Sequence, residues 1–122
     1  MDRRVQLIIS LIEAGLLSSP DLTLLAREVN LSTSRLRHLF KKETGMTPAQ
    51  YLKVLRLLEA ERLLRTTFLS VKEIANRIGI TNASHFVREF KRVYGLAPTA
   101  YRRHLEDSQE KANGESALPI KR

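Results

Sequence analysis

The chain has 122 residues, which is enough for one domain or two very small ones. Hydrophobic residues make up 43% of it, so it can form a packed core and is not a disordered chain. It has no cysteine, which excludes disulfides, thiolate catalysis and cysteine-ligated metal sites. Its apolar runs are far shorter than the roughly 20 residues of a membrane helix, and no signal peptide is visible, so we expect a soluble, cytoplasmic protein.

Charge is the strongest feature of the composition. Lys and Arg total 21 and Asp and Glu total 13, which gives a net charge of +8. In residues 107–122 three acidic and three basic side chains cancel, so the whole excess lies in residues 1–106. A folded body with this imbalance predicts a polyanionic partner, most often nucleic acid. A basic surface without a partner is the alternative that composition leaves open.

Apolar residues recur at spacings of three and four along the chain, which predicts helices throughout and no strand. Asn30, Gly45, Gly79 and Gly95 are expected to end helices, because these residue types tolerate the left-handed conformation found past many helix ends. The predicted helices span about residues 3–17, 23–29, 32–44, 48–64, 70–79, 82–95 and 98–106. We therefore expect an all-α fold of about seven helices, followed by a flexible C-terminal tail over residues 107–122.

The chain contains two copies of one helical unit. Leu25-Ala26 matches Ile74-Ala75 at an offset of 49 residues, and Phe40-Lys41 matches Phe90-Lys91 at an offset of 50. Each copy has a short helix, a tight turn and a longer helix, which is the layout of the helix-turn-helix motif that reads DNA. The alternative is a generic repeat of helical hairpins, for which two copies are few.

The longer helix of each copy has an apolar and a polar face when its residues are placed at about 100° intervals. The predicted core faces are Leu36, Leu39 and Phe40 in the first copy and Ala83, Phe86, Phe90 and Val93 in the second. The opposite faces are mostly polar or cationic: Ser34, Arg35, Arg37, His38, Lys41 and Lys42, and then Ser84, His85, Val87, Arg88, Lys91 and Arg92.

These polar faces suit the major groove of a DNA duplex. Arg37 and Arg88 can bond guanine O6 and N7 as a fork, and the Val87 methyls can pack on a thymine methyl. The cations further along each helix are expected nearer to phosphates, where they add affinity without sequence preference: Lys41, Lys42, Lys91 and Arg92. The alternative for all of these residues is an ordinary solvated face.

The helix predicted over residues 48–64 has apolar residues on two sides. They are Tyr51, Leu55 and Leu58 on one side and Leu57, Ala60 and Leu64 on another. Such a helix suits a linker over about residues 48–65 between a lobe over about 3–47 and a lobe over about 66–106. It spans about 25 Å, so it can hold two recognition helices about one DNA turn, ~34 Å, apart. The core helix of a single bundle is the alternative.

No pattern of catalytic or metal-ligating residues stands out. His38, His85 and His104 lack ligand spacing, apart from Glu89 four residues after His85, which indicates a surface pair. No Ser-His-acid set and no phosphate loop occurs. We therefore expect no enzyme activity, no metal and no cofactor.

The second copy carries a specific resemblance to a known family. Its matching residues are Ile74-Ala75, Gly79, Ser84, Phe86, Arg88, Phe90-Lys91, Gly95, Pro98 and Tyr101-Arg102. The first copy adds Leu25-Ala26, Ser32, Leu36, Leu39-Phe40-Lys41, Gly45, Pro48 and Tyr51. Over about residues 8–103 the chain resembles the DNA-binding domain of the AraC/XylS family of bacterial transcriptional regulators. It departs from the family pattern at Ile80, where an aromatic residue is common, and at His85, where Tyr is common.

The resemblance implies a domain of two helix-turn-helix lobes, joined by a long central helix, whose recognition helices enter adjacent major-groove segments. It implies base contacts from Ser34, Arg35, Arg37 and His38 and, less specifically, from Ala83, Ser84, Val87 and Arg88. It also implies backbone contacts from Lys41, Lys42, Lys91 and Arg92.

The implied function is that of a sequence-specific transcriptional regulator on the nucleoid, with double-stranded DNA and RNA polymerase as partners. Most relatives carry a further domain that binds a small molecule or dimerises. We expect no effector pocket within these residues. The chain is then expected to be either a stand-alone regulator or a fragment of a longer protein. A helical adaptor for an acidic protein and a nucleic-acid packaging protein are the other hypotheses. Neither explains why Arg37 and His38 differ from the matched Val87 and Arg88.

Overall fold

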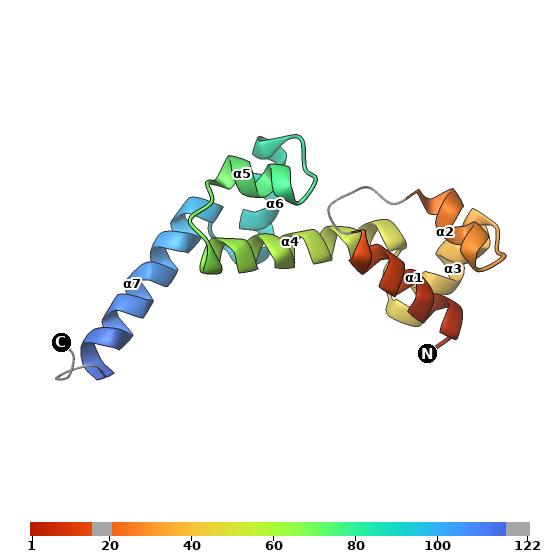
Figure 1. Cartoon of the computed structure of the whole chain (residues 1–122), viewed down its shortest axis with the longest axis horizontal. Helices are drawn as coiled ribbons and strands as arrows, with labels where there is room; N and C mark the ends of the chain where they lie inside the picture. The colour runs from red at the N-terminus through yellow and green to blue at the C-terminus, as the bar shows by residue number, and fades with distance from the viewer. Residues whose placement is uncertain (16–20, 117–122) are drawn as a thin grey trace. The chain divides into compact units, whose positions relative to one another are not determined.

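The computed structural model of the chain describes residues 1–15 and 21–116, with side chains described through residue 110. The described residues form helices and no strand (Figure 1). The helices are α1 (Arg3–Ala14), α2 (Leu22–Glu28), α3 (Thr33–Thr44), α4 (Pro48–Thr66), α5 (Val71–Arg77), α6 (Ala83–Tyr94) and α7 (Pro98–Ser116). The predicted all-α fold is therefore confirmed. No helix among these is both long enough and apolar enough to cross a bilayer.

The two longer helices of the repeat begin and end in the same way. The Ser32 side chain accepts the backbone N–H of the residue three positions on at 3.1 Å, and Asn82 does the same for α6 at 3.0 Å. Gly45 and Gly95 follow the last residues of α3 and α6 with φ of +82° and +85°. This left-handed conformation suits glycine and ends each helix where the sequence predicts.

The turn that precedes each of these helices is also the same. Asn30 has φ +57° and Gly79 has φ +82°, so both adopt the left-handed conformation that closes a helix. The N–H of the next residue bonds back to the carbonyl of Ala26 at 3.0 Å in the first copy and of Ala75 at 2.8 Å in the second. Each short helix therefore ends in a Schellman turn, which fixes where the longer helix starts.

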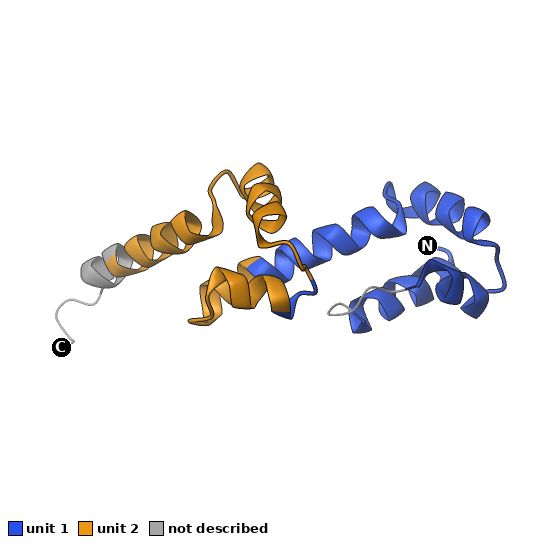
Figure 2. Ribbon diagram, turned by 90° about the horizontal axis from the view of Figure 1, so that it is seen from above, with its two compact units in different colours: residues 1–60, 77–79 blue, residues 61–76, 80–122 orange. Residues whose placement is uncertain are grey.

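The chain divides into two compact units, and the division falls within α4, which is one continuous helix (Figure 2). Unit 1 comprises residues 1–60 and 77–79, and unit 2 comprises residues 61–76 and the described residues from 80 onward. Each unit contains one of the two longer helices, α3 in unit 1 and α6 in unit 2.

The core of unit 1 is built from one face of each of its first three helices. Its buried residues are Val5, Ile8 and Ile12 from α1, Leu25, Ala26 and Val29 from α2 and its end, and Leu36 and Phe40 from α3. Tyr51 of α4 adds an edge-on contact to Phe40, with ring centroids 5.5 Å apart. Leu36 and Phe40 thus fix which side of α3 faces inward.

Unit 2 has an aromatic core around Phe90. Phe86 and Phe90 are fully buried. The Phe90 ring stacks on Tyr94 at 4.4 Å and meets Tyr101 of α7 edge-on at 5.3 Å. These contacts fix the inward face of α6 as Leu36 and Phe40 fix that of α3.

Two predicted helix ends are wrong. The first helix was expected to reach about residue 17, but α1 ends at Ala14, and the Gly15 N–H bonds to the Leu11 carbonyl at 3.1 Å; residues 16 and 17 lie outside the described residues. Gly is a poor helix former, which accounts for this stop.

The seventh helix was expected to end near residue 106, but α7 continues to Ser116, so residues 107–116 of the predicted tail are helical. Gln109, Glu110 and Ala112 have high helix propensity, which favours continuation of the helix beyond residue 106.

Two predicted apolar contacts are also absent. Val93 was expected on the core face of α6 but is 50% exposed, and the neighbouring Tyr94 is the residue that packs on Phe90. Leu58 was expected on a buried side of α4 but is 54% exposed. Leu55 is the last α4 residue that packs on the core of unit 1, which leaves Leu58 beyond that core.

Candidate nucleic-acid interface

The outer face of α3 is polar and open to solvent. With Leu36 and Phe40 buried, the six residues predicted on the opposite face are all exposed: Ser34, Arg35, Arg37, His38, Lys41 and Lys42. No carboxylate among the described residues pairs with any of the cations in this set. The helix therefore presents an unneutralised positive surface in unit 1.

The outer face of α6 is similar but less charged. Ser84, His85, Arg88, Lys91 and Arg92 are exposed, whereas Ala83 and Val87 are half-buried. Arg92 pairs with Glu89 at 3.0 Å, which offsets one of the cations that was expected at a phosphate. The two helices thus carry matched faces of unequal charge, with α3 the more positive.

The structure gathers three of the four base-contact candidates of α3 along one groove. This groove, of about 410 Å³, is lined by Arg4, Leu31, Ser34, Arg35, His38, Leu39 and Lys42. Arg37 lies instead beside a separate hollow of about 270 Å³ that is lined mainly by apolar residues, including Ile12, Leu25 and Leu52. Ser34, Arg35 and His38 therefore share their surroundings, and Arg37 does not.

Sequence reasoning missed Arg4 as part of this surface. It lies in α1, outside both helix-turn-helix motifs, and it contributes a cation to the groove beside α3. The signal available was the Arg3-Arg4 pair at the start of a helix whose apolar face predicts packing on α3.

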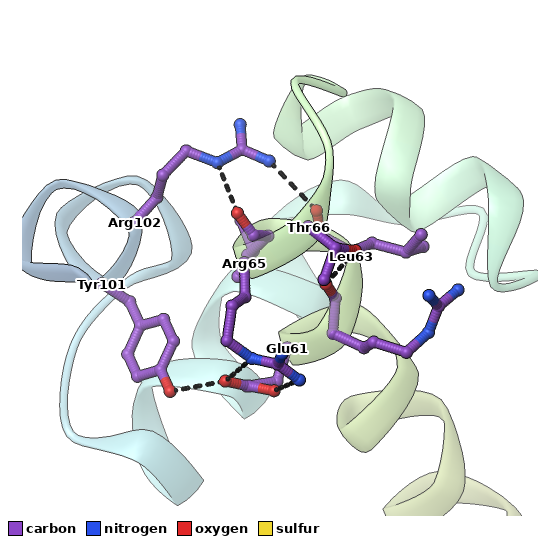
Figure 3. Close-up of polar contacts among 8 residues, drawn as sticks. Glu61, Leu63, Arg65, Thr66, Tyr101 and Arg102 are labelled. Atoms are coloured by element: carbon purple, nitrogen blue, oxygen red, sulfur yellow. Dashed lines mark hydrogen bonds and ion pairs between the residues drawn. The ribbon is translucent and has the colours of Figure 1, made fainter. Parts of the chain in front are cut away.

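In unit 2, Tyr101 and Arg102 of α7 bond to residues near the end of α4 and hold the two helices together (Figure 3). The Tyr101 hydroxyl donates to Glu61 at 2.9 Å, and Arg65 donates to the same carboxylate at 3.3 Å. Burial, and then the bond to Glu61, raise the pKa of the Tyr101 hydroxyl above its ordinary value.

Arg102 fixes the segment between α4 and α5. Its guanidinium donates to the backbone carbonyls of Leu64 at 3.0 Å, Thr67 at 3.2 Å and Leu69 at 2.6 Å. The Leu64 carbonyl lies in the last turn of α4 and has no backbone N–H partner within the helix. Arg102 therefore acts as a C-terminal cap of α4. The Tyr101-Arg102 pair therefore supports the unit that presents α6.

A metal centre has no candidate in the described part of the chain. Nowhere in it do three or more His, Asp or Glu side chains gather as ligands would. The outer faces of α3 and α6 offer hydrogen-bonding groups and positive charge.

Comparison with known proteins agrees with this geometry. The family model described as a helix-turn-helix domain matches residues 25–104. The HTH-type transcriptional activator RhaR of Mannheimia succiniciproducens is 43% identical over 76 residues, which are 62% of this chain and 28% of that protein. The chain thus spans less than a third of the length of this relative.

Solved structures share the fold of nearly the whole described chain. An AraC-type DNA-binding domain-containing regulator from Chromobacterium violaceum has a TM-score of 0.78 and 27% identity, covering 84% of this chain and 92% of that one. The DNA-binding domain of AdpA, solved in complex with a target DNA, has a TM-score of 0.75 and 28% identity, covering 97% of this chain and 98% of that one. By its family model, its relatives and its fold, the chain belongs to the AraC-type helix-turn-helix family.

Proposed function

We propose that this chain binds double-stranded DNA sequence-specifically, as the DNA-reading part of a transcriptional regulator, with α3 and α6 as its two recognition helices. The observation that carries the proposal is the matched construction of these helices. Each follows a left-handed turn, buries two large apolar residues on its inner face, and exposes a serine and several cations on its outer face. The AdpA domain, which the chain matches over 97% of its length, was solved with DNA.

Within this proposal the N-terminal halves of the two helices read bases in the major groove. The base-contacting residues are Ser34, Arg35, Arg37 and His38 on α3 and Ala83, Ser84, Val87 and Arg88 on α6. The contacts to the DNA backbone come from Lys41, Lys42, Lys91 and Arg92. Because no described carboxylate pairs with the cations of α3, we assign the larger share of the electrostatic affinity to α3.

The two helices are proposed to read two successive major-groove segments of the same duplex. The support is that α4 is one unbroken helix of 19 residues across the boundary of the two units. At ~1.5 Å per residue it extends about 28 Å, which approaches the ~34 Å of one DNA turn.

The remaining parts of the proposal follow from family membership. A regulator of this type acts at promoters in the bacterial cytoplasm and on the nucleoid, where it recruits or excludes RNA polymerase. We propose that it does so without catalytic activity, without a cofactor and without an effector pocket in these residues.

The proposal is tested by selecting bound sequences from a random duplex library. We expect enrichment of two different sequence boxes, with centres about ten base pairs apart. Equal retention of all duplexes, together with equal binding to heparin, would instead indicate a basic surface without sequence preference and would contradict the proposal.

A further inference from the structure

The groove beside α3 is the part of the positive surface that the helix-turn-helix motif does not account for. Its cations come from two different elements: Arg4 from the first turn of α1, and Arg35 and Lys42 from α3. Leu31 and Leu39 supply its apolar lining, and the exposed residues Ser34 and His38 also line its volume of about 410 Å³. A DNA strand bound in this groove would therefore contact both α1 and α3.

The Arg4 side chain is held in place on one edge only. Its Nε and Nη2 donate to the two carboxylate oxygens of Asp2, at 3.2 Å and 2.9 Å. A guanidinium has five N–H donors, so three remain. Residues 1–15 and 21–110 provide no acceptor for these three, and the side chain is 48% exposed. Arg4 thus has a fixed plane and free donors at the groove, the arrangement that suits recognition of a phosphate.

Asp2 is itself anchored to α3. Its carboxylate caps α1 by accepting the Arg4 backbone N–H at 2.8 Å, and its own backbone N–H donates to the Glu43 side chain at 2.6 Å. Glu43 lies in the last turns of α3. The first turn of α1 is therefore tied to α3, so Arg4 keeps its position relative to the recognition face.

The net charge of the groove favours an anion. Arg4, Arg35 and Lys42 contribute three positive charges to it, and two carboxylates offset part of this charge, that of Asp2 beside Arg4 and that of Glu43 beside Asp2. Because Arg4 is already oriented by Asp2, less side-chain freedom is lost when it binds. A phosphate oxyanion is the ligand class that fits these donors.

We propose that Arg4 binds a backbone phosphate of the same duplex that α3 reads, with Lys42 lining the same groove and Asp2 as the residue that positions Arg4. This inference rests on the proposed function and adds α1 to the DNA interface. We assign the phosphate to DNA rather than to a free anion because Ser34, Arg35 and His38, which are proposed to contact bases, line the same groove.

The test compares Arg4→Gln with Arg3→Gln. Both variants remove one positive charge, but Arg3 is exposed on the same helix turn and does not line the groove. We expect Arg4→Gln to weaken binding about fivefold to tenfold at 0.1 M salt, on preferred and random duplexes alike, and to reduce the slope of log affinity against log salt by about one. Arg3→Gln should leave the slope unchanged, and Arg4→Lys should retain most of it. Thermal unfolding of each variant checks that α1 still packs.

Neutralising single phosphates gives the decisive measurement. In duplexes with one methylphosphonate linkage, we expect one position at which the substitution weakens the wild-type chain but not Arg4→Gln. Equal losses for both chains at every position, or equal salt slopes for Arg4→Gln and Arg3→Gln, would overturn the inference. The inference would also be overturned if Arg4→Gln bound DNA as tightly as the wild-type chain without inorganic phosphate and differed from it only when inorganic phosphate was added. That result would identify the groove as a site for a free anion. A wild-type chain without sequence preference would contradict the proposed function instead, and the Arg4 comparison would still be measurable on random duplexes.

Discussion

Arg37 and Arg35 are both exposed on α3, but they lie in different surroundings. Arg35 lines the cationic groove with Ser34 and His38, whereas Arg37 lies beside a mainly apolar hollow. Arg37 therefore has fewer neighbouring cations that could take over its contact if it were removed. This makes it the clearer test of base reading by a single residue.

We predict that Arg37→Ala costs about 1–3 kcal/mol on the preferred site and relaxes specificity at one base position. Binding to all single-base variants of the selected site provides the measurement. Lys41→Ala is the matched control, since it removes a cation one turn further along α3 and should weaken all sequences equally. A uniform loss for Arg37→Ala would show that this arginine contacts only the backbone.

Asp2 offers a test of the ion pair that holds Arg4. Hydrogen bonds from Arg4 lower the pKa of the Asp2 carboxyl from its ordinary 3.8 to about 2. Because this folded-state pKa is lower than the unfolded one, the pair stabilises the fold at neutral pH, and this contribution is lost as the pH falls from about 4 to about 2.

We predict a midpoint of about 2 when the Asp2 carboxyl is titrated by NMR. In Arg4→Gln the midpoint should move up toward 3.8, although the backbone bond at the helix cap keeps part of the shift. A midpoint near 3.8 in the wild-type chain would show that Arg4 is not held by Asp2.

At the scale of the elements, the starts and stops of α3 and α6 were predictable from the sequence because each depends on a single local residue. Ser32 and Asn82 cap α3 and α6, and Gly45 and Gly95 end them. The inward face of α3 was also predictable, and so was that of α6 apart from Val93, since Phe40 and Phe90 follow the helical period.

The features that the sequence did not reveal depend on partners far along the chain. Arg102 bonds backbone carbonyls 33–38 residues away, and no side-chain pattern signals a carbonyl acceptor. Arg4 joins the recognition surface only because α1 packs on α3. The length of α7 was missed for a different reason: Ala112 is the one hydrophobic residue in the sequence of residues 107–116, so this stretch has no periodic apolar pattern.

Arg102 should therefore control the stability of one unit without affecting the other. We predict that Arg102→Met destabilises unit 2 by about 2–3 kcal/mol, because partly buried carbonyls at the end of α4 lose their donor. Hydrogen exchange should show lost protection in α5, α6 and α7 and unchanged protection in α1, α2 and α3. Arg103→Met, at the exposed neighbouring position, is the control. Equal loss of protection in both units would show that they unfold together.

At the scale of the whole molecule, the proposed function requires two unlike recognition helices that act on one duplex. The outer faces differ at matched positions, with Arg37 against Val87 and His38 against Arg88, so each helix should prefer its own box. When both boxes are bound together, the second contact is intramolecular and can strengthen binding by about 10²-fold or more. A duplex with a single box should therefore be bound weakly. A duplex with both boxes should be bound tightly, but only when the boxes have the correct spacing.

The most direct test of this claim is to change the spacing of the two selected boxes. Inserting about five base pairs between them turns the second box to the opposite side of the duplex. We predict that the affinity then falls to that of a duplex with one box, whereas changing the spacer sequence at constant length has no such effect. Unchanged affinity after the insertion would contradict the claim that α3 and α6 read the same stretch of DNA together.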